Sequence, residues 1–402
     1  MNDLFQKGKI IYFIFVFSEN NRKFKDKFVT LLNICIKTTY MIEQVIINNF
    51  RSIRQCTLPL ERLNVLIGTN GVGKSNFIAF FELVHAIYKQ QLGLYTLEHG
   101  GIDNLLHFGR KNSEYIEGVI DFSHTNAFFF KLKPSQNNKG FLEHTGDFFN
   151  EKEIPSKEYS EWNKMIWDKA VEESEMVNQK HDRAQYVKKY LDSFHIYHFH
   201  DTSKTSGMKR MCNVSDNASL KEDASNLASF LYLLSQKHEK EFKRIEGTIR
   251  SVAPYFEKFD LKPDRANEQN IQLEWKEKNS DMYLNAHNFS DGTIRFIALA
   301  TLLLQPNLPE VILIDEPELG LHPAAINKLA ALIKMASHKS QVIVSTQSPN
   351  LVDCFEPENI ITVDREGQQS VFKRLNKEDL ADWLEDYSIG DLWEKNVIGG
   401  QL

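Results

Sequence analysis

The stretch LNVLIGTNGVGKSN, residues 63–76, decides the fold of this chain. LNVLIG is a short apolar run bounded by turn residues, which predicts a buried strand. The residues that follow match the pattern GxxxxGK[ST], and the segment from Ser75 onward carries apolar residues at helical spacing. A strand, a glycine-rich loop and a helix in this order predict a phosphate-binding P-loop, and a glycine turn that arose by chance is the weaker alternative.

Each part of this loop suits a phosphate group. The glycines let backbone N–H groups converge on phosphate oxygens, and the helix N-terminus adds a partial positive charge of about half a unit. Lys74 can reach the β- and γ-phosphates of a nucleotide, and Ser75 can ligate Mg²⁺. The predicted phosphate-binding residues are Asn70, Gly71, Val72, Gly73, Lys74, Ser75 and Asn76.

A second apolar run, VILI, ends in the acids Asp315 and Glu316. In a parallel sheet, the carboxyl end of such a strand lies beside the P-loop. Asp315 would then hold Mg²⁺, directly or through water, and Glu316 would orient and deprotonate the attacking water. An exposed acidic strand end is the alternative, and it is the weaker one in a chain that also carries a P-loop.

Two further segments suit an anion. NFSDGTIRF places Ser290 and Gly292 just before an apolar helix, which predicts either a second anion-binding helix N-terminus or a simple N-cap. The strand-like run at residues 341–345 leads into Gln347, whose polar side chain could sense a γ-phosphate. A turn closed by Pro349 is the alternative for this last segment.

Composition limits the class of protein. A net charge of −6 over 402 residues argues against a broadly basic surface that coats nucleic acid. The four cysteines are far apart and form no CxxC, so we expect a reducing cytoplasm and neither a disulfide framework nor a zinc site. The one membrane-like run, IIYFIFVF, is shorter than the roughly 20 apolar residues that a bilayer requires. His198 and His200 would share one face of a strand, where a structural role is favoured over metal binding.

The patterns divide the chain into five parts. Residues 1–40 are predicted to be absent from the working protein or disordered, since a clean strand pattern begins at Met41. The other parts are the two halves of a split α/β domain at 41–133 and 286–374, an inserted lid or arm at 134–285, and a helical tail at 375–402. The insertion is predicted to be largely helical, with helices over 158–190 and 226–256 and a strand near 194–200, and a hairpin is predicted to turn at Glu366–Gly367.

Taken in order, the P-loop, FSDGT, ILIDEPELGLHP and STQSP resemble the ABC-type ATPase head. The closest resemblance is to the RecF, SMC and Rad50 branch and to the ATPase part of OLD-family proteins. NNFRSI resembles the opening strand of that branch, while LHFGRK, YHFHD and LWEKNVIGG resemble a group of bacterial RecF-like ATPases of the AAA type. The resemblance covers roughly residues 41–402. It implies an α/β P-loop NTPase with a mainly parallel central sheet, an antiparallel strand layer and an inserted helical lid or arm.

The resemblance also implies a mechanism. The P-loop of one subunit would hold ATP and Mg²⁺, and Ser290 and Gly292 of a second subunit would cap the γ-phosphate. Arg51 stands where this branch often contacts nucleotide. ATP would thus join two heads in a homodimer, and hydrolysis would release them.

Three positions depart from the family pattern. Gln347 stands where ABC ATPases usually have a switch histidine, and because glutamine cannot take a proton we expect slow hydrolysis. Asp291 replaces the usual first glycine of the signature segment, which we define as residues 288–296, and puts an acid near the incoming phosphates. His322 stands where the D-loop usually carries aspartate, as is common in the OLD-like group.

Other function classes fit less well. A transporter subunit would have its signature closer to the P-loop, and an OLD-type nuclease would need more residues after Pro349. A small-molecule kinase would lack the signature and the Asp-Glu pair. The resemblance favours a cytoplasmic ATPase, without a membrane partner, that acts on DNA or a DNA-associated partner in DNA repair or phage defence, together with a separate nuclease or effector protein. The alternative is a slow, nucleotide-gated regulator that binds a partner protein, since acids interleave the basic residues of 180–189 and 237–250.

Overall fold

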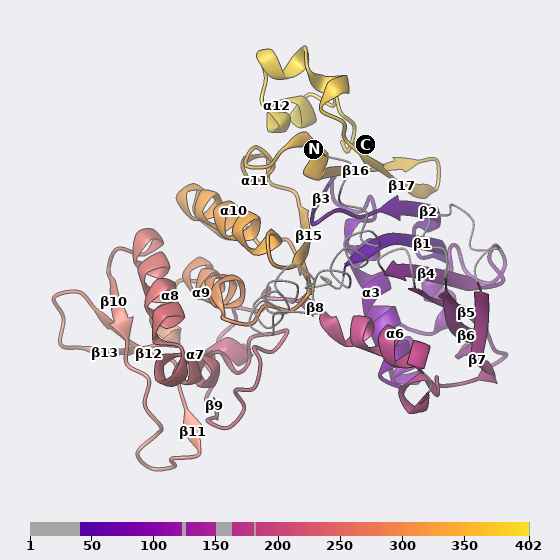
Figure 1. Ribbon diagram of the computed structural model, residues 1–402. Helices are drawn as coiled ribbons and strands as arrows, with labels where there is room; N and C mark the ends of the chain where they lie inside the picture. The colour runs from indigo at the N-terminus through magenta and orange to yellow at the C-terminus, as the bar shows by residue number, and fades with distance from the viewer. Residues whose placement is uncertain (1–40, 123–125, 150–162, 181, 402) are drawn as a thin grey trace, which may run out of the picture. The chain divides into compact units, whose positions relative to one another are not determined.

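The computed structural model describes residues 41–122, 126–149, 163–180 and 182–401. Its two largest sheets have six strands each (Figure 1). The predicted extension at residues 1–40 lies outside the described residues. The described residues from Met41 onward form one compact unit, and the finer division of this unit into head halves, insertion and tail stays a prediction.

The first sheet is mainly parallel, with the strand order β17-β16-β3-β15-β14-β8. Its strands are β3 (Leu63–Ile67), β8 (Phe194–Tyr197), β14 (Val311–Asp315), β15 (Gln341–Thr346), β16 (Ile360–Glu366) and β17 (Gln369–Arg374). Only β17 pairs antiparallel, through the predicted hairpin, which is confirmed. The central strands are buried on both faces, as expected where helices cover a parallel sheet. Strand β3 therefore lies between β15 and β16. Both of these neighbours come from the C-terminal part of the sequence.

The second sheet is antiparallel throughout, with the order β2-β1-β4-β5-β6-β7. Its strands are β1 (Ile42–Phe50), β2 (Ile53–Pro59), β4 (Ile116–Phe122), β5 (Asn126–Pro134), β6 (Gly140–Phe149) and β7 (Asn163–Val171). The remaining strands form two small sheets. One pairs β9 (Cys212–Asn213) with β11 (Asn270–Ile271), and the other contains β10 (Phe256–Phe259), β12 (Glu274–Glu277) and β13 (Tyr283–Asn285).

Helices cover both faces of the parallel sheet. The helices of the described residues are α3 (Lys74–Tyr88), α4 (Leu92–Glu98), α5 (Ile102–Leu105), α6 (Asp182–Ser193), α7 (Leu227–Lys237), α8 (Glu239–Val252), α9 (Asp291–Leu304), α10 (Pro323–Ser337), α11 (Pro349–Val352) and α12 (Ile389–Glu394). Because successive strand residues point to opposite faces, Leu66 and Leu313 join the apolar cluster of α3 and the antiparallel sheet. Val65 and Ile312 join the cluster of α7 to α10. Thus α3 and α9 pack on opposite faces of one sheet (Figure 1).

The predicted fold class, an α/β fold with a mainly parallel sheet and an antiparallel layer, is confirmed. The helix predicted over residues 158–190 is wrong, because residues 163–171 form strand β7 and α6 begins only at Asp182. Strand β7 is the edge strand of its sheet, and its Lys164 and Lys169 are exposed. An edge strand tolerates such charges and loses the regular alternation of a buried strand, so this segment was misread as a polar helix.

The predicted insertion is also less helical than expected. Strands β6 and β7 extend the antiparallel sheet, and β8 is an edge strand of the parallel sheet. The helix predicted over 226–256 is two helices, α7 and α8, which are separated at His238. The predicted helical tail contains two single 3-10 turns followed by α12.

Candidate nucleotide site

The predicted site residues meet at one edge of the parallel sheet. In the register of the strands, Ile67 lies opposite Thr346, and Ser345 lies opposite Asp315. The P-loop follows β3 directly, and α3 starts at Lys74. The carboxyl ends of β3, β15 and β14 therefore bring together the P-loop, Gln347 and the two acids Asp315 and Glu316, at the sheet edge where α/β proteins bind ligands.

The P-loop holds its lysine against its own backbone. The Lys74 side chain is buried, and its Nζ donates to the carbonyl oxygens of Gly68 at 2.5 Å and Thr69 at 3.0 Å. Burial lowers the pKa of Lys74, and the nearby acids Glu316, Asp315 and Glu318 oppose this shift. A phosphate group would add a further negative charge beside this buried ammonium.

The loop between strand and helix is open to a ligand. Asn70, Gly71 and Ser75 are exposed. Gly71 and Gly73 have φ of +83° and +120°, a region that glycine enters without a steric penalty. A side chain at Gly73 would also collide with Ser370 on β17. The described geometry therefore fits phosphate oxygens above the loop, with the exposed Ser75 hydroxyl available to a metal ion.

The two acids after β14 are held by β15. Asp315 accepts a hydrogen bond from the Ser345 hydroxyl, and Gln347 donates through Nε2 to Oε1 of Glu316. The N–H of Glu316 donates to the carbonyl of Ser345 at 3.0 Å. The φ of Glu316 is +41°, a left-handed value that costs a non-glycine residue about 1–3 kcal/mol. The predicted base is thus kept in a strained backbone conformation, and the predicted switch glutamine touches it directly.

Glu318 is a residue that sequence reasoning missed. It is 8% exposed and accepts from the Thr346 hydroxyl at 2.5 Å and from the Gln347 N–H at 3.1 Å. Its Oε2 is buried and has no partner among the described residues. Burial raises the pKa of this carboxyl. Glu318 therefore anchors the backbone of Gln347, and its place in the sequence Asp-Glu-Pro-Glu was the available signal.

The signature segment caps helix α9. Ser290 is exposed, and its Oγ accepts from the Thr293 N–H at 3.2 Å, so the N-cap expected as the simpler alternative is present. Lys209 is buried and its Nζ lies 3.0 Å from Oδ1 of Asp291. The hydrogen bond from Lys209 lowers the pKa of Asp291. The acid that replaces the usual glycine is therefore paired within its own chain, which the sequence did not indicate.

Arg295 fixes this helix to the site. Its buried guanidinium donates to the carbonyl oxygens of Phe199 at 2.8 Å and His200 at 3.0 Å, beyond the end of β8. It also donates to the carbonyl oxygen of Leu319, which follows the acids of β14. The Arg295 side chain thus joins helix α9 to the segments that follow β8 and β14, at the sheet edge that carries the P-loop.

Arg51 lies beside the start of α3. Its Nη1 is 3.5 Å from Oδ1 of Asn76, and the Nδ2 of Asn76 donates to Ser52 Oγ at 2.7 Å. Arg51 occupies the turn between β1 and β2 with a φ of +48°. The structure therefore brings Arg51 to the P-loop helix, and its contact with nucleotide stays a prediction.

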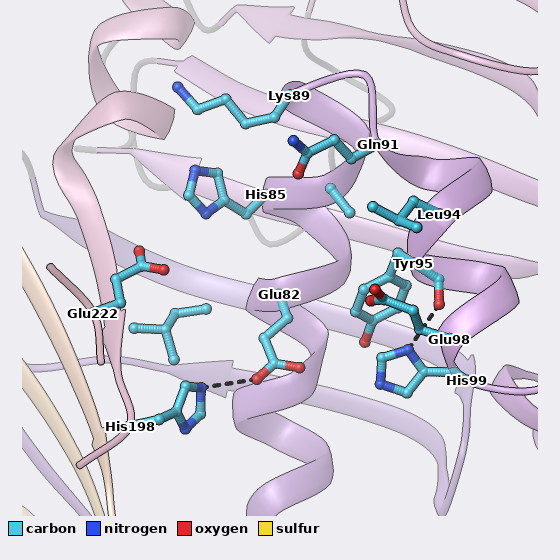
Figure 2. A pocket seen from close by; sticks show the side chains of 12 residues that line it. Glu82, His85, Lys89, Gln91, Leu94, Tyr95, Glu98, His99, His198 and Glu222 are labelled. Carbon is cyan, nitrogen blue, oxygen red and sulfur yellow. Dashed lines mark hydrogen bonds and ion pairs between the residues drawn. The ribbon is translucent and has the colours of Figure 1, made fainter. Parts of the chain in front are cut away.

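A pocket of about 360 Å³ lies further along α3 (Figure 2). Its lining includes Glu82 and His198, which form an ion pair at 3.0 Å. Glu82 is eight residues beyond Lys74, or about 12 Å along the helix, so the pocket is separate from the phosphate site.

No cluster of three or more metal-ligating side chains occurs in the described part of the chain. His198 and His200 follow β8 rather than lying on it, and the ion pair supports a structural role for His198.

Solved structures with the same fold include the heads of SMC proteins. One is an SMC head bound to the C-terminal winged-helix domain of ScpA, with 16% identity and a TM-score of 0.57 over 85% of this chain and 99% of that one. Another is the SMC head with an extended coiled coil from Pyrococcus furiosus, bound to the C-terminal domain of ScpA. It has 15% identity and a TM-score of 0.53 over 86% of this chain and 98% of that one.

The sequence comparisons address the family. No curated protein matches the chain. In the described ranges, no helix has the length and apolar character that crossing a membrane requires. A family model described as "AAA domain, putative AbiEii toxin, Type IV TA system" matches residues 63–353. The chain therefore belongs to this family of AAA domains, and it is a P-loop ATPase with the fold of an SMC head.

Proposed function

We propose that this protein binds and slowly hydrolyses ATP, and that ATP joins two copies of it head to head. The observation that carries the proposal is the position of the two anion-binding segments. The P-loop opens α3 on one face of the parallel sheet, whereas the exposed Ser290 opens α9 on the other. Because the two segments of one copy begin helices on opposite faces, we propose that the signature segment meets the P-loop of a second copy. The second copy would then present its signature segment to the phosphates that the first copy holds.

The residues at the sheet edge fit ATP and Mg²⁺. Lys74 offers a buried ammonium, and Ser75 and Asp315 offer the oxygen ligands that Mg²⁺ prefers. When bound, the metal ion would neutralise charge on the β- and γ-phosphates. Glu316 would take the proton of the attacking water, and Gln347, already hydrogen-bonded to Glu316, would orient that water. Because Gln347 cannot itself accept a proton, we propose slow turnover.

What the dimer acts on is proposed from its family and fold neighbours. One matching SMC head was solved with the winged-helix domain of ScpA bound and another with the C-terminal domain of ScpA bound, and the family description names a toxin of Type IV toxin–antitoxin systems. We propose DNA or a DNA-associated protein as the partner, in repair or phage defence. A nucleotide-gated regulator of a partner protein is the second candidate, supported by the net charge of −6. ATP-dependent DNA binding that weakens steeply with salt would favour the first candidate over the second.

The first experiment is the molar mass in solution with Mg-ATP. The Glu316→Gln variant slows hydrolysis while keeping a carbonyl oxygen to accept from Gln347. We expect ATP to double its mass, and we expect no change when Lys74→Ala is added to the same variant. A mass that never responds to nucleotide would refute the joining of heads. A mass that doubles regardless of Lys74 would show that the dimer does not depend on the P-loop.

A further inference from the structure

The last described residues of the chain fold back onto the P-loop. Residues 397–401 follow α12 and return to β16, near the C-terminal end marked in Figure 1. The carbonyl oxygen of Gly400 accepts a 3.0 Å hydrogen bond from the N–H of Thr69, the second residue of the P-loop. Gly400 is buried. A segment more than 300 residues away in sequence thus contacts the loop that would hold the phosphates.

This return segment is fixed from both sides. The N–H of Gly400 donates to Oδ1 of Asp364 on β16 at 2.5 Å. The indole N–H of the buried Trp393 donates to the Gly400 carbonyl at 3.1 Å. A carbonyl oxygen has two lone pairs, so this one is fully used by Trp393 and Thr69. The contact with the P-loop is therefore part of a satisfied buried network.

A side chain at either glycine of this segment would be strained and would crowd a neighbouring side chain. Gly399 and Gly400 have φ of +79° and +81°, the left-handed region that favours glycine. A Cβ at Gly399 would lie 2.6 Å from Oδ2 of Asp364, and one at Gly400 would lie 2.9 Å from Nε1 of Trp393. The Gly-Gly pair is what allows the chain to turn close enough for its carbonyl to reach Thr69.

The contact acts on a single peptide unit. The N–H of Thr69 and the C=O of Gly68 belong to the same planar peptide, in which they point in opposite directions. The N–H donates to Gly400 at 3.0 Å, and the C=O accepts from Lys74 Nζ at 2.5 Å. Rotation of this peptide would break both hydrogen bonds. The return segment therefore fixes the first turn of the P-loop at the point where the lysine is held.

We propose that residues 397–401 are a positioning element of the nucleotide site. Through Gly400 they hold the Gly68–Thr69 peptide, and with it Lys74 and the N–H groups of the loop, in the orientation that phosphate requires. The inference rests on the proposed binding of ATP at the P-loop. Its residues act through the loop, so their loss weakens nucleotide binding more than it changes the rate of the chemical step.

The test compares two variants with a matched control. One variant lacks residues 399–402, and the other is Gly399→Ala, which sets a side chain against Asp364. The control is Gly367→Ala in the β16–β17 turn, where φ is +61° and, apart from the chain neighbours of Gly367, the described residues place no atom within 4 Å of the added Cβ. The control thus introduces the same kind of backbone strain without touching residues 397–401.

We expect both variants to raise the Kd for Mg-ATP about tenfold, measured by calorimetry, and the KM for ATP by a similar factor. The kcat should stay within about twofold, and Gly367→Ala should bind as the wild type does. A purely structural role would lower Tm and the active fraction without changing Kd or KM, and that result would overturn the inference. If the shortened chain does not fold, Gly399→Ala decides alone. Wild-type protein that binds no Mg-ATP would instead refute the proposed function, and the inference with it.

Discussion

Gly292→Ala separates a packing role of the signature glycine from a role at the phosphate. A Cβ at this position would lie 3.2 Å from the carbonyl carbon of Gly320 and 3.8 Å from Cα of Leu321, and closer still to the Gly320 oxygen. These are backbone atoms that cannot swing aside. Overpacking of this kind costs about 1–3 kcal/mol, against a gain of up to about 1 kcal/mol from replacing a helical glycine. We therefore expect Gly292→Ala to lower the free energy of unfolding by about 1–2 kcal/mol even without nucleotide.

The control for this prediction is Gly247→Ala. Gly247 is an exposed residue inside α8, and outside the helix backbone the described residues place only Arg250 Nη2, at 3.9 Å, near an added Cβ. This change should raise the free energy of unfolding by about 0.5–1 kcal/mol. Chemical unfolding of the nucleotide-free proteins measures both. If Gly292→Ala is as stable as the wild type, the packing argument is wrong. If it is destabilised, Ser290→Ala becomes the better probe of the proposed contact between heads.

Three further changes test the electrostatics of the site and its surroundings. The raised pKa of Glu318 means that its carboxyl contributes stability below its unfolded pKa of about 4.3 and loses this contribution as pH rises through the folded pKa. Glu318→Gln should therefore gain Tm over the wild type at pH 8 but not at pH 4.5. Lys209→Met removes the ion-pair partner of Asp291, so the ATP concentration required for the proposed dimerisation should rise about tenfold, and adding Asp291→Asn should restore it. The ion pair with Glu82 raises the pKa of His198, so its stabilisation is present below about pH 6.5 and is lost above the folded pKa. His198→Asn should thus cost more at pH 6 than at pH 9, by less than about 1 kcal/mol because the pair is partly exposed.

The P-loop and the acids of β14 could be placed from sequence because local patterns and a parallel sheet determine where they lie. LNVLI predicts β3, and the glycine pattern predicts the loop after it, so the meeting of Lys74 with Asp315 and Gln347 follows from strand order. Strand β7 was missed because an edge strand carries exposed lysines. Its apolar signal is too weak to compete with a helical interpretation.

Other parts of the site depend on contacts between distant residues, which no local pattern reveals. Asp291 could be seen as an unusual acid, but its partner Lys209 comes from a separate turn. Gly400 reaches Thr69 only because β16 and α12 bring the end of the chain back to the P-loop. The Gly-Gly pair could be recognised as a tight turn from the sequence. Its hydrogen bond with Thr69 could not, because that contact depends on the fold.

The place of β3 between β15 and β16 has a consequence for biosynthesis. The antiparallel sheet is complete in sequence at Val171, so it can form early on the ribosome. Strand β3 must wait for both of its neighbours, and at 5–20 residues per second the synthesis of the intervening chain takes on the order of 15–60 s. During that time an apolar strand has unpaired backbone on both sides, a state prone to mispairing. We expect incomplete chains to need chaperones and to lack an ATP site until β15 and β16 have emerged.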